Sequence, residues 1–302
     1  MQILQLVDVV KTYEKNTAVD QVSFNVPAGS IFGLLGPNGA GKTSLIRIIT
    51  TITQADSGQI LLDGEKLNSR HPEMIGYMPE ERGLYKKMKV GERLVYLARL
   101  KGLSGPESKK ALGEWFARFE IESWWNKKVE ELSKGMQQKI QFISTVVHKP
   151  KLLILDEPFS GLDPINTNLI KSEIHELNKQ GTSIIFSTHR MEQVEEICEE
   201  IVLINKGKNV LQGKVKDIKN EFKDNLFHLT FEGQLPEVIT DQLQIVDRDA
   251  GSLRVKLPDT ESSNLLLRQL IDKGIRIHSF NEILPGLNEI FIKRVEASNH
   301  SN

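Results

Sequence analysis

The sequence predicts an α/β fold with a mainly parallel sheet, a helical insertion and a small C-terminal α+β domain. Short apolar runs such as 31–35 and 152–155 have the length of buried strands, and they alternate with helical segments. Alternation of this kind places helices on the faces of a parallel sheet. Between Lys89 and His148 the apolar spacing becomes helical, which indicates an insertion between two parts of the sheet.

The N-terminal elements follow from apolar patterning and from turn residues. Strands are expected over residues 2–9, 21–26 and 30–35. A glycine-rich turn then leads into a helix over 42–50, and a short strand over 59–62 ends at an Asp-Gly turn. An apolar strand is therefore followed by a turn and a helix, as in α/β proteins.

The elements of the insertion and of the segments after it are also predicted from apolar spacing. Leu94, Leu97, Ala98 and Leu100 are expected on one face of a helix, because their spacing is helical. Strand–helix alternation then returns. The expected elements are a strand over 152–155, a helix over 165–180, a strand over 183–187, a helix over 191–200 and a strand over 201–204.

A second unit is expected after a polar stretch at 213–225, which has the composition of a hinge. The predicted domains are 1–220, with a helical subdomain over about 86–150, and an accessory α+β domain over 221–302. The expected elements of the second unit are strands over 225–231, 243–246, 252–257 and 275–280, and helices over 261–273 and 287–294. No residue cluster with obvious chemistry occurs in it.

Composition excludes several classes of protein. The 302 residues contain 39 basic and 40 acidic side chains, so overall charge attracts neither nucleic acid nor anionic lipid. Cys198 is the only cysteine, which excludes an internal disulfide and fits a reducing compartment. No apolar run approaches the roughly 18 residues of a membrane span, and the start lacks the features of a signal peptide. Any membrane association is therefore expected to occur through a separate membrane protein.

The strongest chemical signal lies between the third strand and the helix after it. It comprises Gly36, Pro37, Asn38, Gly39, Ala40, Gly41, Lys42 and Thr43, with Ser44 directly following. Glycines let successive backbone N–H groups surround phosphate oxygens, and the helix N-terminus adds positive potential. Lys42 is expected to reach the outer phosphates of a nucleotide, and the Thr43 hydroxyl to ligate Mg²⁺. A chance glycine turn is a minor alternative in this strand–helix context.

Acidic and basic groups follow two other apolar strands. Asp156 and Glu157 end the strand at 152–155, at the edge of a parallel sheet where ligands bind. Asp156 is expected to hold Mg²⁺, and Glu157 to polarise the attacking water. His189 follows the next strand, emerges at the same edge and is predicted to contact the γ-phosphate. Alone, each of these residues is more often structural, but together with the phosphate loop they predict a nucleotide-hydrolysing site.

Residues 132–138 (LSKGMQQ) resemble the signature motif of ABC ATPases, Leu-Ser-Gly-Gly-Gln. A local alternative is that Ser133 simply caps a helix. The motif order favours the family: the phosphate loop, the signature, the Asp-Glu strand, a loop ending at Asp163, and then His189. The resemblance covers about residues 1–215. It identifies Asp163 with the D-loop aspartate and Tyr13 with the aromatic residue that stacks on adenine, although core packing is the common role for such a tyrosine.

The resemblance implies an ATP-hydrolysing subunit that uses ATP and Mg²⁺ in a head-to-tail dimer. Each ATP would contact one subunit's phosphate loop and Ser133 and Gly135 of the other subunit, which is either identical or related. The implied partner is an integral-membrane permease, and the implied location is cytoplasmic, peripheral on the inner face of the cell membrane. Residues 76–85 (GYMPEERGLY) and the C-terminal domain resemble the sodium-extrusion and antibiotic-export subgroup, which implies export.

Two departures from the family pattern affect the site. Glu80 stands where the family has a glutamine that senses Mg²⁺ and the attacking water. A carboxylate also ligates Mg²⁺, but it adds negative charge beside the γ-phosphate. Lys134 and Met136 replace a glycine and a glutamine of the signature. Since Ser133 and Gly135 are the expected phosphate contacts, the site is expected to be active, with an altered rate.

Other functions fit the motifs less well. A soluble ABC-type ATPase acting on nucleic acid or the ribosome is the main alternative, but there is no room for an inserted long coiled coil and only one phosphate loop. A GTPase or small-molecule kinase leaves the signature unexplained. A degenerate regulatory module is disfavoured because Lys42, Asp156, Glu157 and His189 are all present. A transporter ATPase without a nucleic-acid partner is the prediction.

Overall fold

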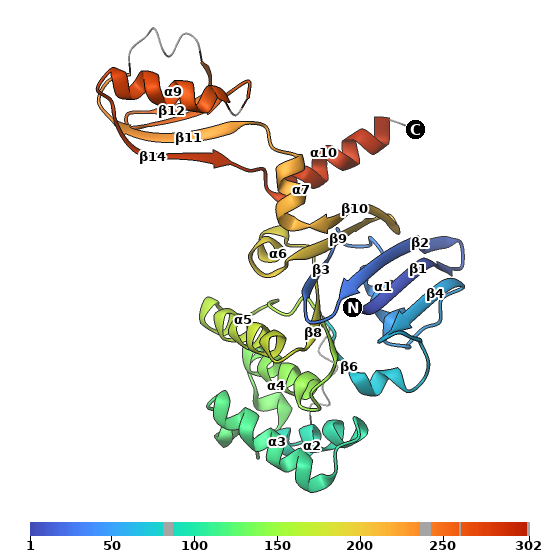
Figure 1. Ribbon diagram of the computed structural model, residues 1–302. Helices are drawn as coiled ribbons and strands as arrows, with labels where there is room; N and C mark the ends of the chain where they lie inside the picture. The colour runs from blue at the N-terminus through green and yellow to red at the C-terminus, as the bar shows by residue number, and fades with distance from the viewer. Residues whose placement is uncertain (81–86, 236–242, 260, 301–302) are drawn as a thin grey trace. The chain divides into compact units, whose positions relative to one another are not determined.

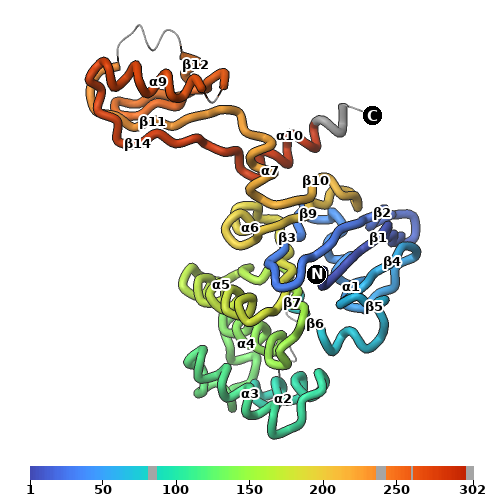
Figure 2. The backbone as a smooth tube through the Cα atoms, in the orientation of Figure 1, coloured from blue at the N-terminus to red at the C-terminus, as the bar shows by residue number. Residues whose placement is uncertain are grey.

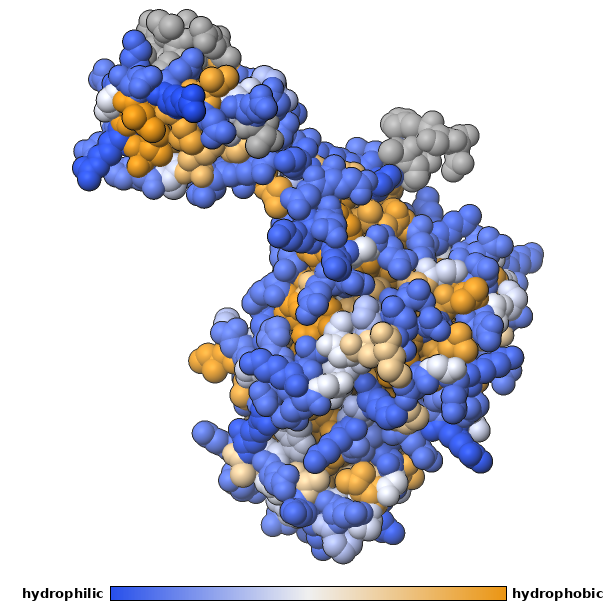
Figure 3. All heavy atoms as spheres, viewed as in Figure 1, coloured by the Kyte–Doolittle hydropathy of each residue, from blue (hydrophilic) through white to orange (hydrophobic). Residues whose placement is uncertain are grey.

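The computed structural model describes residues 1–80, 87–235, 243–259 and 261–300. The chain forms two compact units, Met1–Lys214 and Val215–Asn302, shown in Figures 1 and 2. None of the described helices is long and apolar enough to cross a membrane. The face seen in Figure 3 is mainly hydrophilic, with apolar side chains gathered in small separate patches.

The first unit contains the predicted mainly parallel sheet, in the strand order β10-β9-β3-β8-β7-β6. Its strands are β3 (Ile31–Leu35), β6 (Ile75–Met78), β7 (Leu152–Asp156), β8 (Ser183–Thr188), β9 (Glu200–Asn205) and β10 (Lys208–Lys214). All neighbours are parallel except the edge pair β9–β10. Every residue of β3, β7 and β8 is buried, as expected for strands covered on both faces. The carboxyl ends of these three strands therefore meet at one edge.

An antiparallel sheet of order β2-β1-β4-β5 completes the core of the first unit. Its strands are β1 (Gln2–Tyr13), β2 (Asn16–Pro27), β4 (Ser57–Leu62) and β5 (Glu65–Lys66). One apolar cluster joins this sheet, helix α1 (Lys42–Ile49) and the parallel sheet. Phe24 of β2 stacks on Phe32 of β3 with ring centroids 5.6 Å apart, which packs the two sheets together.

The helical insertion comprises α2 (Val90–Leu100), α3 (Gly105–Arg118) and α4 (Lys134–Val146), which lie together in Figure 1. Trp115 of α3 packs edge-on against Phe142 of α4, with ring centroids 6.1 Å apart. The face predicted for α2 is only partly correct. Leu94 and Ala98 are fully buried, but the side chain of Leu100 is 62% exposed. A six-residue spacing from Leu94 carries Leu100 out of the buried stripe.

Two helices flank the parallel sheet later in the chain, close to their predicted positions. They are α5 (Pro164–Lys179) and α6 (Met191–Ile197). Helix α6 ends at Ile197, before the predicted end at residue 200, because Cys198 has extended backbone angles and β9 starts at Glu200. Strands β6 and β10 were not predicted as strands, although both belong to the main sheet.

The second unit is an antiparallel sheet of order β12-β13-β11-β14 packed against a helix. Its elements are α7 (Val215–Glu221), β11 (Leu226–Glu232), β12 (Gln244–Asp249), β13 (Ser252–Lys256), α9 (Glu261–Asp272), β14 (Arg276–Ile283) and α10 (Leu287–His300). The boundary between the two units lies within the polar stretch at 213–225, and much of that stretch is the helix α7, in which Val215 and Ile218 are buried. Arg294 of α10 packs over the ring of Phe222, which fixes the two ends of this unit together.

Candidate nucleotide site

Residues 36–41 form the loop between β3 and α1, and two of its positions have room only for glycine. A Cβ atom on Gly36 would lie 2.2 Å from the carbonyl oxygen of Ile204, and one on Gly41 would lie 2.2 Å from that of Ala18. Gly41 also has a left-handed φ of 109°. At Gly39, by contrast, a Cβ would meet no atom within 4 Å. The loop is tightly packed at its ends and open in its middle, which fits a loop that surrounds a phosphate group.

Lys42 folds back over this loop. Its side chain is buried, and Nζ donates hydrogen bonds to the carbonyl oxygens of Gly36 at 2.7 Å and Pro37 at 3.2 Å. Burial lowers the pKa of Lys42, while the carboxylates of Glu157 and Asp156 oppose that shift. The ammonium group therefore lies at the phosphate loop, within the electrostatic reach of the acidic residues. The remaining loop positions differ in exposure: Asn38 and Thr43 are exposed, Ala40 is buried, and Pro37 and Ser44 are intermediate.

Asp156 ends strand β7 and is 4% exposed. It pairs in register with Ser187 of β8, whose hydroxyl donates a hydrogen bond of 2.8 Å to Oδ1. Burial raises the pKa of Asp156, because desolvation disfavours the ionised carboxylate, and the Ser187 hydrogen bond opposes this only in part. A cation beside this carboxylate would stabilise its ionised form.

Glu157 has an unusual backbone conformation and a tightly held side chain. Its φ of 50° lies in the left-handed region, and its N–H donates to the carbonyl oxygen of Ser187 at 2.9 Å. Oε2 accepts a hydrogen bond of 3.0 Å from the Thr188 hydroxyl. Oε1 accepts one of 2.8 Å from the backbone N–H of His189. A strained residue held in this way is typical of functional sites.

His189 and Glu80 complete this group at the carboxyl edge of the sheet. Nδ1 of His189 lies 2.6 Å from Oε1 of Glu157, and the histidine side chain is 44% exposed. Glu80 is exposed, follows Pro79 at the end of β6, and contributes to the electrostatic environment of Lys42. The described residues of the first unit thus bring together, at one edge, the predicted phosphate, metal and water-activating groups.

Ser133 and Asp163 lie in a second group. Each is a helix N-cap: Ser133 accepts a hydrogen bond from the backbone N–H of Met136 at 3.3 Å, and Asp163 accepts one from that of Asn166 at 2.9 Å. Both caps are exposed. A Cβ on Gly135 would lie 3.7 Å from the side chain of Leu162, so the signature loop and the Asp163 loop are neighbours. This pair of loops presents hydroxyl, backbone and carboxylate groups to solvent.

Tyr13 ends strand β1 and is 40% exposed. The ammonium of Lys11 lies 5.5 Å from the centroid of its ring. The same β1–β2 hairpin contains Ala18, whose carbonyl oxygen lies against Gly41. The hairpin that carries Tyr13 is therefore in contact with the phosphate loop, and the aromatic ring is accessible rather than part of the core.

Comparison with known proteins decides the family. A family model described as ABC transporter matches residues 19–160, and one described as the DrrA1-3-like ATP-binding protein C-terminal domain matches residues 213–295. The uncharacterized ABC transporter ATP-binding protein YhaQ of Bacillus subtilis is 46% identical over 297 residues, which cover 98% of this chain and 99% of that protein. The chain belongs to the ABC transporter ATP-binding proteins.

Other relatives agree with this membership. The linearmycin resistance ATP-binding protein LnrL of Bacillus subtilis is 35% identical over 235 residues, covering 76% of each chain. A solved structure of the ATP-binding subunit of an ABC transporter is 30% identical, covers 73% of this chain and 93% of that one, and superposes with a TM-score of 0.68. The predicted family, α/β fold and ATPase class of this ABC transporter protein are confirmed, and the alternative that acts on nucleic acid or the ribosome is not supported.

Some residues around the site of this ABC protein were not predicted. Ser187 and Thr188 hold the carboxylates of Asp156 and Glu157, respectively. Two hydroxyl residues at the end of an apolar strand, directly before His189, were the available signal. Tyr85, the last residue of the segment that resembles the export subgroup, lies outside the described residues.

Proposed function

We propose that this ABC transporter ATP-binding protein hydrolyses MgATP to drive export through a separate membrane permease. The observation that carries the proposal is the Glu157 carboxylate, fixed by Thr188 and His189 at the sheet edge that also holds Lys42. Export is supported by relatives whose names refer to linearmycin resistance and to Nod factor export. The two names differ in substrate, so the cargo is assigned only as an exported compound.

Hydrolysis would use the groups already in contact at this site. The ammonium of Lys42, which now donates to the carbonyls of Gly36 and Pro37, would donate instead to phosphate oxygens of ATP. Backbone N–H groups around Gly39 would surround the same phosphates. Glu157 would accept the proton of the attacking water, a contribution of about 10²- to 10⁴-fold in rate. His189 would orient Glu157 and contact the γ-phosphate from the exposed side of its ring.

Mg²⁺ is proposed to bind between Thr43, Asp156 and Glu80, together with phosphate oxygens. When bound, the ion would neutralise charge that develops on the phosphates. Asp156 fits this role because burial disfavours its ionised form, which a divalent cation would stabilise. No cluster of three or more His, Cys, Asp or Glu side chains capable of holding a metal occurs among the described residues. Mg²⁺ commonly takes one or two carboxylates plus substrate phosphates and needs no such cluster.

A second ATPase subunit, identical or related, is proposed to complete each site. Ser133 and Gly135 are expected to contact the ATP of the opposite subunit, and both lie at the N-terminus of α4, where backbone N–H groups attract phosphate. Asp163 is expected to act in the same interface, and Tyr13 to stack on adenine. The exposure of Ser133, Asp163 and Tyr13 supports contacts with groups outside their own subunit core.

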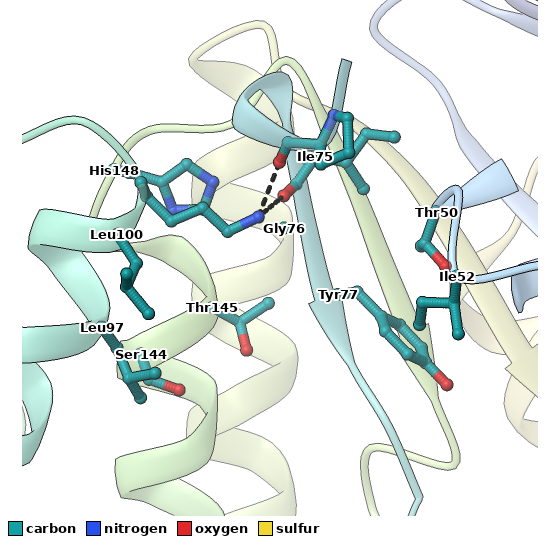
Figure 4. A pocket seen from close by; sticks show the side chains of 12 residues that line it. Thr50, Ile52, Ile75, Gly76, Tyr77, Leu97, Leu100, Ser144, Thr145 and His148 are labelled. Carbon is teal, nitrogen blue, oxygen red and sulfur yellow. Dashed lines mark hydrogen bonds between the residues drawn. The ribbon is translucent and has the colours of Figure 1, made fainter. Parts of the chain in front are cut away.

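A groove of about 310 Å³ in the first unit is proposed as the docking site for a cytoplasmic segment of the permease. Leu97 and Leu100 of α2 line one side, and Ile52 and Tyr77 lie on the other (Figure 4). Ile52 and Leu100 are each 62% exposed, which is unusual for large apolar side chains. The groove joins the helical insertion to β6, the strand that leads to Glu80. A permease segment there would connect transport to the nucleotide site.

The proposed location is the cytoplasmic face of the cell membrane, reached through that permease. The test begins with the genes that flank this chain: a multi-span membrane protein encoded there would be co-expressed with it, extracted in detergent and tested for co-purification. Co-purification of the two chains, together with ATPase activity that depends on Glu157, is the expected result. A Leu100→Arg variant should lose the membrane partner, because a charge would enter the apolar groove. Retention of the partner by this variant would exclude the groove as the docking site.

A further inference from the structure

Helix α4 carries two buried glutamines on one face. Gln138 is 2% exposed and Gln141 is 4% exposed, and a spacing of three residues places them on the same side of the helix. Nε2 of Gln138 donates to the carbonyl oxygen of Pro158 at 2.9 Å, and Nε2 of Gln141 donates to that of Pro79 at 2.7 Å. Pro158 directly follows Glu157. The helix capped by Ser133 therefore holds both loops that carry the acidic residues of the site.

The bond from Gln141 acts on the peptide group next to Glu80. The Pro79 carbonyl belongs to the planar unit whose nitrogen is that of Glu80, so holding this oxygen fixes the plane from which Glu80 departs. Proline has no N–H, which leaves its carbonyl as the backbone group available for such a bond. Strand β6 also lies close against α4: a Cβ on Gly76 would be 2.4 Å from the carbonyl oxygen of Thr145 (Figure 4).

The amide of Gln141 is poorly explained by stability. Its Oε1 is buried and has no hydrogen-bond partner among the described residues. A buried acceptor without a partner is destabilising, and this cost offsets the hydrogen bond that the amide donates to Pro79, so the net contribution of the amide to stability is small. The hydrogen bond to the Pro79 carbonyl is therefore what glutamine supplies here and an apolar side chain of the same length cannot.

We propose that Gln141 is a positioning residue that acts through Glu80, and that Gln138 does the same for the loop of Glu157. Helix α4 is then the rigid connection between the signature residue Ser133, which serves the opposite subunit, and both acidic loops of its own site. Movement of the signature on ATP binding moves Glu80 and Glu157 with it. This inference rests on the proposed ATPase function and adds two residues to which neither motif nor family resemblance assigned a role.

The test is Gln141→Met, which keeps the length of the side chain and removes the donor. We expect kcat for MgATP to fall about tenfold or more, because small displacements of reacting groups are costly. We expect KM for ATP to stay within about twofold, and the half-saturating Mg²⁺ concentration to rise, since Glu80 is a proposed metal ligand. The Tm should change little, because the variant removes the unpartnered Oε1 and the hydrogen bond to Pro79 together. A lower Tm with unchanged kcat would show that Gln141 only packs the helix.

A matched control is Asn178→Leu, which also replaces an amide that donates to a backbone carbonyl. Asn178 bonds Gly29 at 2.9 Å, far along the chain from the acidic loops. Its kcat and Mg²⁺ dependence should equal those of the wild type. A decrease matching that of Gln141→Met would mean that any loss of an amide bridge slows the enzyme, and would overturn the proposal.

A double-mutant cycle with Glu80→Ala identifies the route of the effect. If Gln141 acts through Glu80, the double variant should be no slower than Glu80→Ala alone. Additive losses would overturn the inference. Absence of ATPase activity in the wild type would instead contradict the proposed function, so the two failures are distinguishable.

Discussion

Nδ1 of His189 and Oε1 of Glu157 lie 2.6 Å apart, although the two residues are separated by 32 positions in the sequence. Parallel pairing of β7 with β8 produces this contact, because Asp156 lies opposite Ser187 and the next residues of both strands continue past the sheet edge. The contact links the proposed general base to a histidine whose side chain is 44% exposed. Mutation of Glu157 is therefore the most direct test of the proposed hydrolytic step.

The variant Glu157→Gln should bind ATP but hydrolyse it about 10²- to 10⁴-fold more slowly. The amide keeps the shape of the side chain and cannot accept the proton of water, whereas Lys42 and the phosphate loop are unchanged. ATP binding by equilibrium dialysis and phosphate release measure the two effects separately. The ATP-bound variant should also elute as a dimer in size exclusion. Hydrolysis at the wild-type rate would remove Glu157 from its role.

The variant Asp156→Asn should be more stable than the wild type while losing Mg²⁺-dependent hydrolysis. Burial raises the folded-state pKa of Asp156, so its contribution to stability is full below the unfolded pKa and is lost as pH rises through the folded pKa. At pH 7 the ionised carboxylate therefore costs stability, and a neutral amide removes that cost. Each kcal/mol gained corresponds to about 2–4 °C in Tm.

Thermal melting of the wild type and of Asp156→Asn, both without Mg²⁺ and nucleotide, tests the predicted sign of the stability difference. The difference in Tm should be largest near neutral pH, shrink as the pH falls through the raised folded-state pKa of Asp156, and level off below pH ~3.9, where the carboxyl group is protonated in both states. A variant that melts below the wild type at pH 7 would contradict the electrostatic account of this site.

Two glycine substitutions in the phosphate loop should differ in their effect on stability. Gly41→Ala would bring Cβ within 2.2 Å of the Ala18 carbonyl, whereas Gly39→Ala meets no atom within 4 Å. Both positions have positive φ, so the backbone strain is shared and the clash is specific to Gly41. We expect the free energy of unfolding to fall by roughly 1–3 kcal/mol more for Gly41→Ala. Denaturant titration of both variants measures this difference, and equal losses would contradict it.

Mixing two inactive variants tests whether Ser133 acts on the opposite subunit. Lys42→Ala removes the ammonium from its own phosphate loop, and Ser133→Arg blocks the site of the partner. A heterodimer of the two has both lesions at one site and an intact Lys42 and Ser133 at the other. ATPase activity should therefore return in part on mixing, to at most about half of the wild-type rate if each site acts independently.

ATP-driven dimerisation should be measured on the same mixtures, because hydrolysis that requires two sites would hide a heterodimer with one good site. Heterodimers that form with ATP, while neither variant dimerises alone, also support action across the interface. Normal hydrolysis by Ser133→Arg on its own would reduce Ser133 to the N-cap of α4 and remove this part of the mechanism.

Local patterns in the sequence were sufficient to predict much of the fold and to single out the candidate site residues. Apolar runs such as 31–35 and 152–155 identified buried strands, because a strand covered on both faces must be apolar throughout. The phosphate loop was identifiable because glycine is required wherever backbone approaches backbone, as at Gly41. These features depend only on residues close together in the chain, so the sequence alone predicts them.

Tertiary structure alone decided which distant residues support the site. Gln141 contacts Pro79 across 62 positions, and Ser187 contacts Asp156 across 31, so no local pattern marks either pair. The polar stretch at 213–225 illustrates the same limit, since its composition did not indicate helix α7 or the burial of Ile218 in it. Glutamine, serine and threonine are common on protein surfaces, so their presence in a sequence does not by itself indicate a role in a site. Burial beside a carboxylate or a carbonyl group gives them their role, and burial is a property of the packed chain.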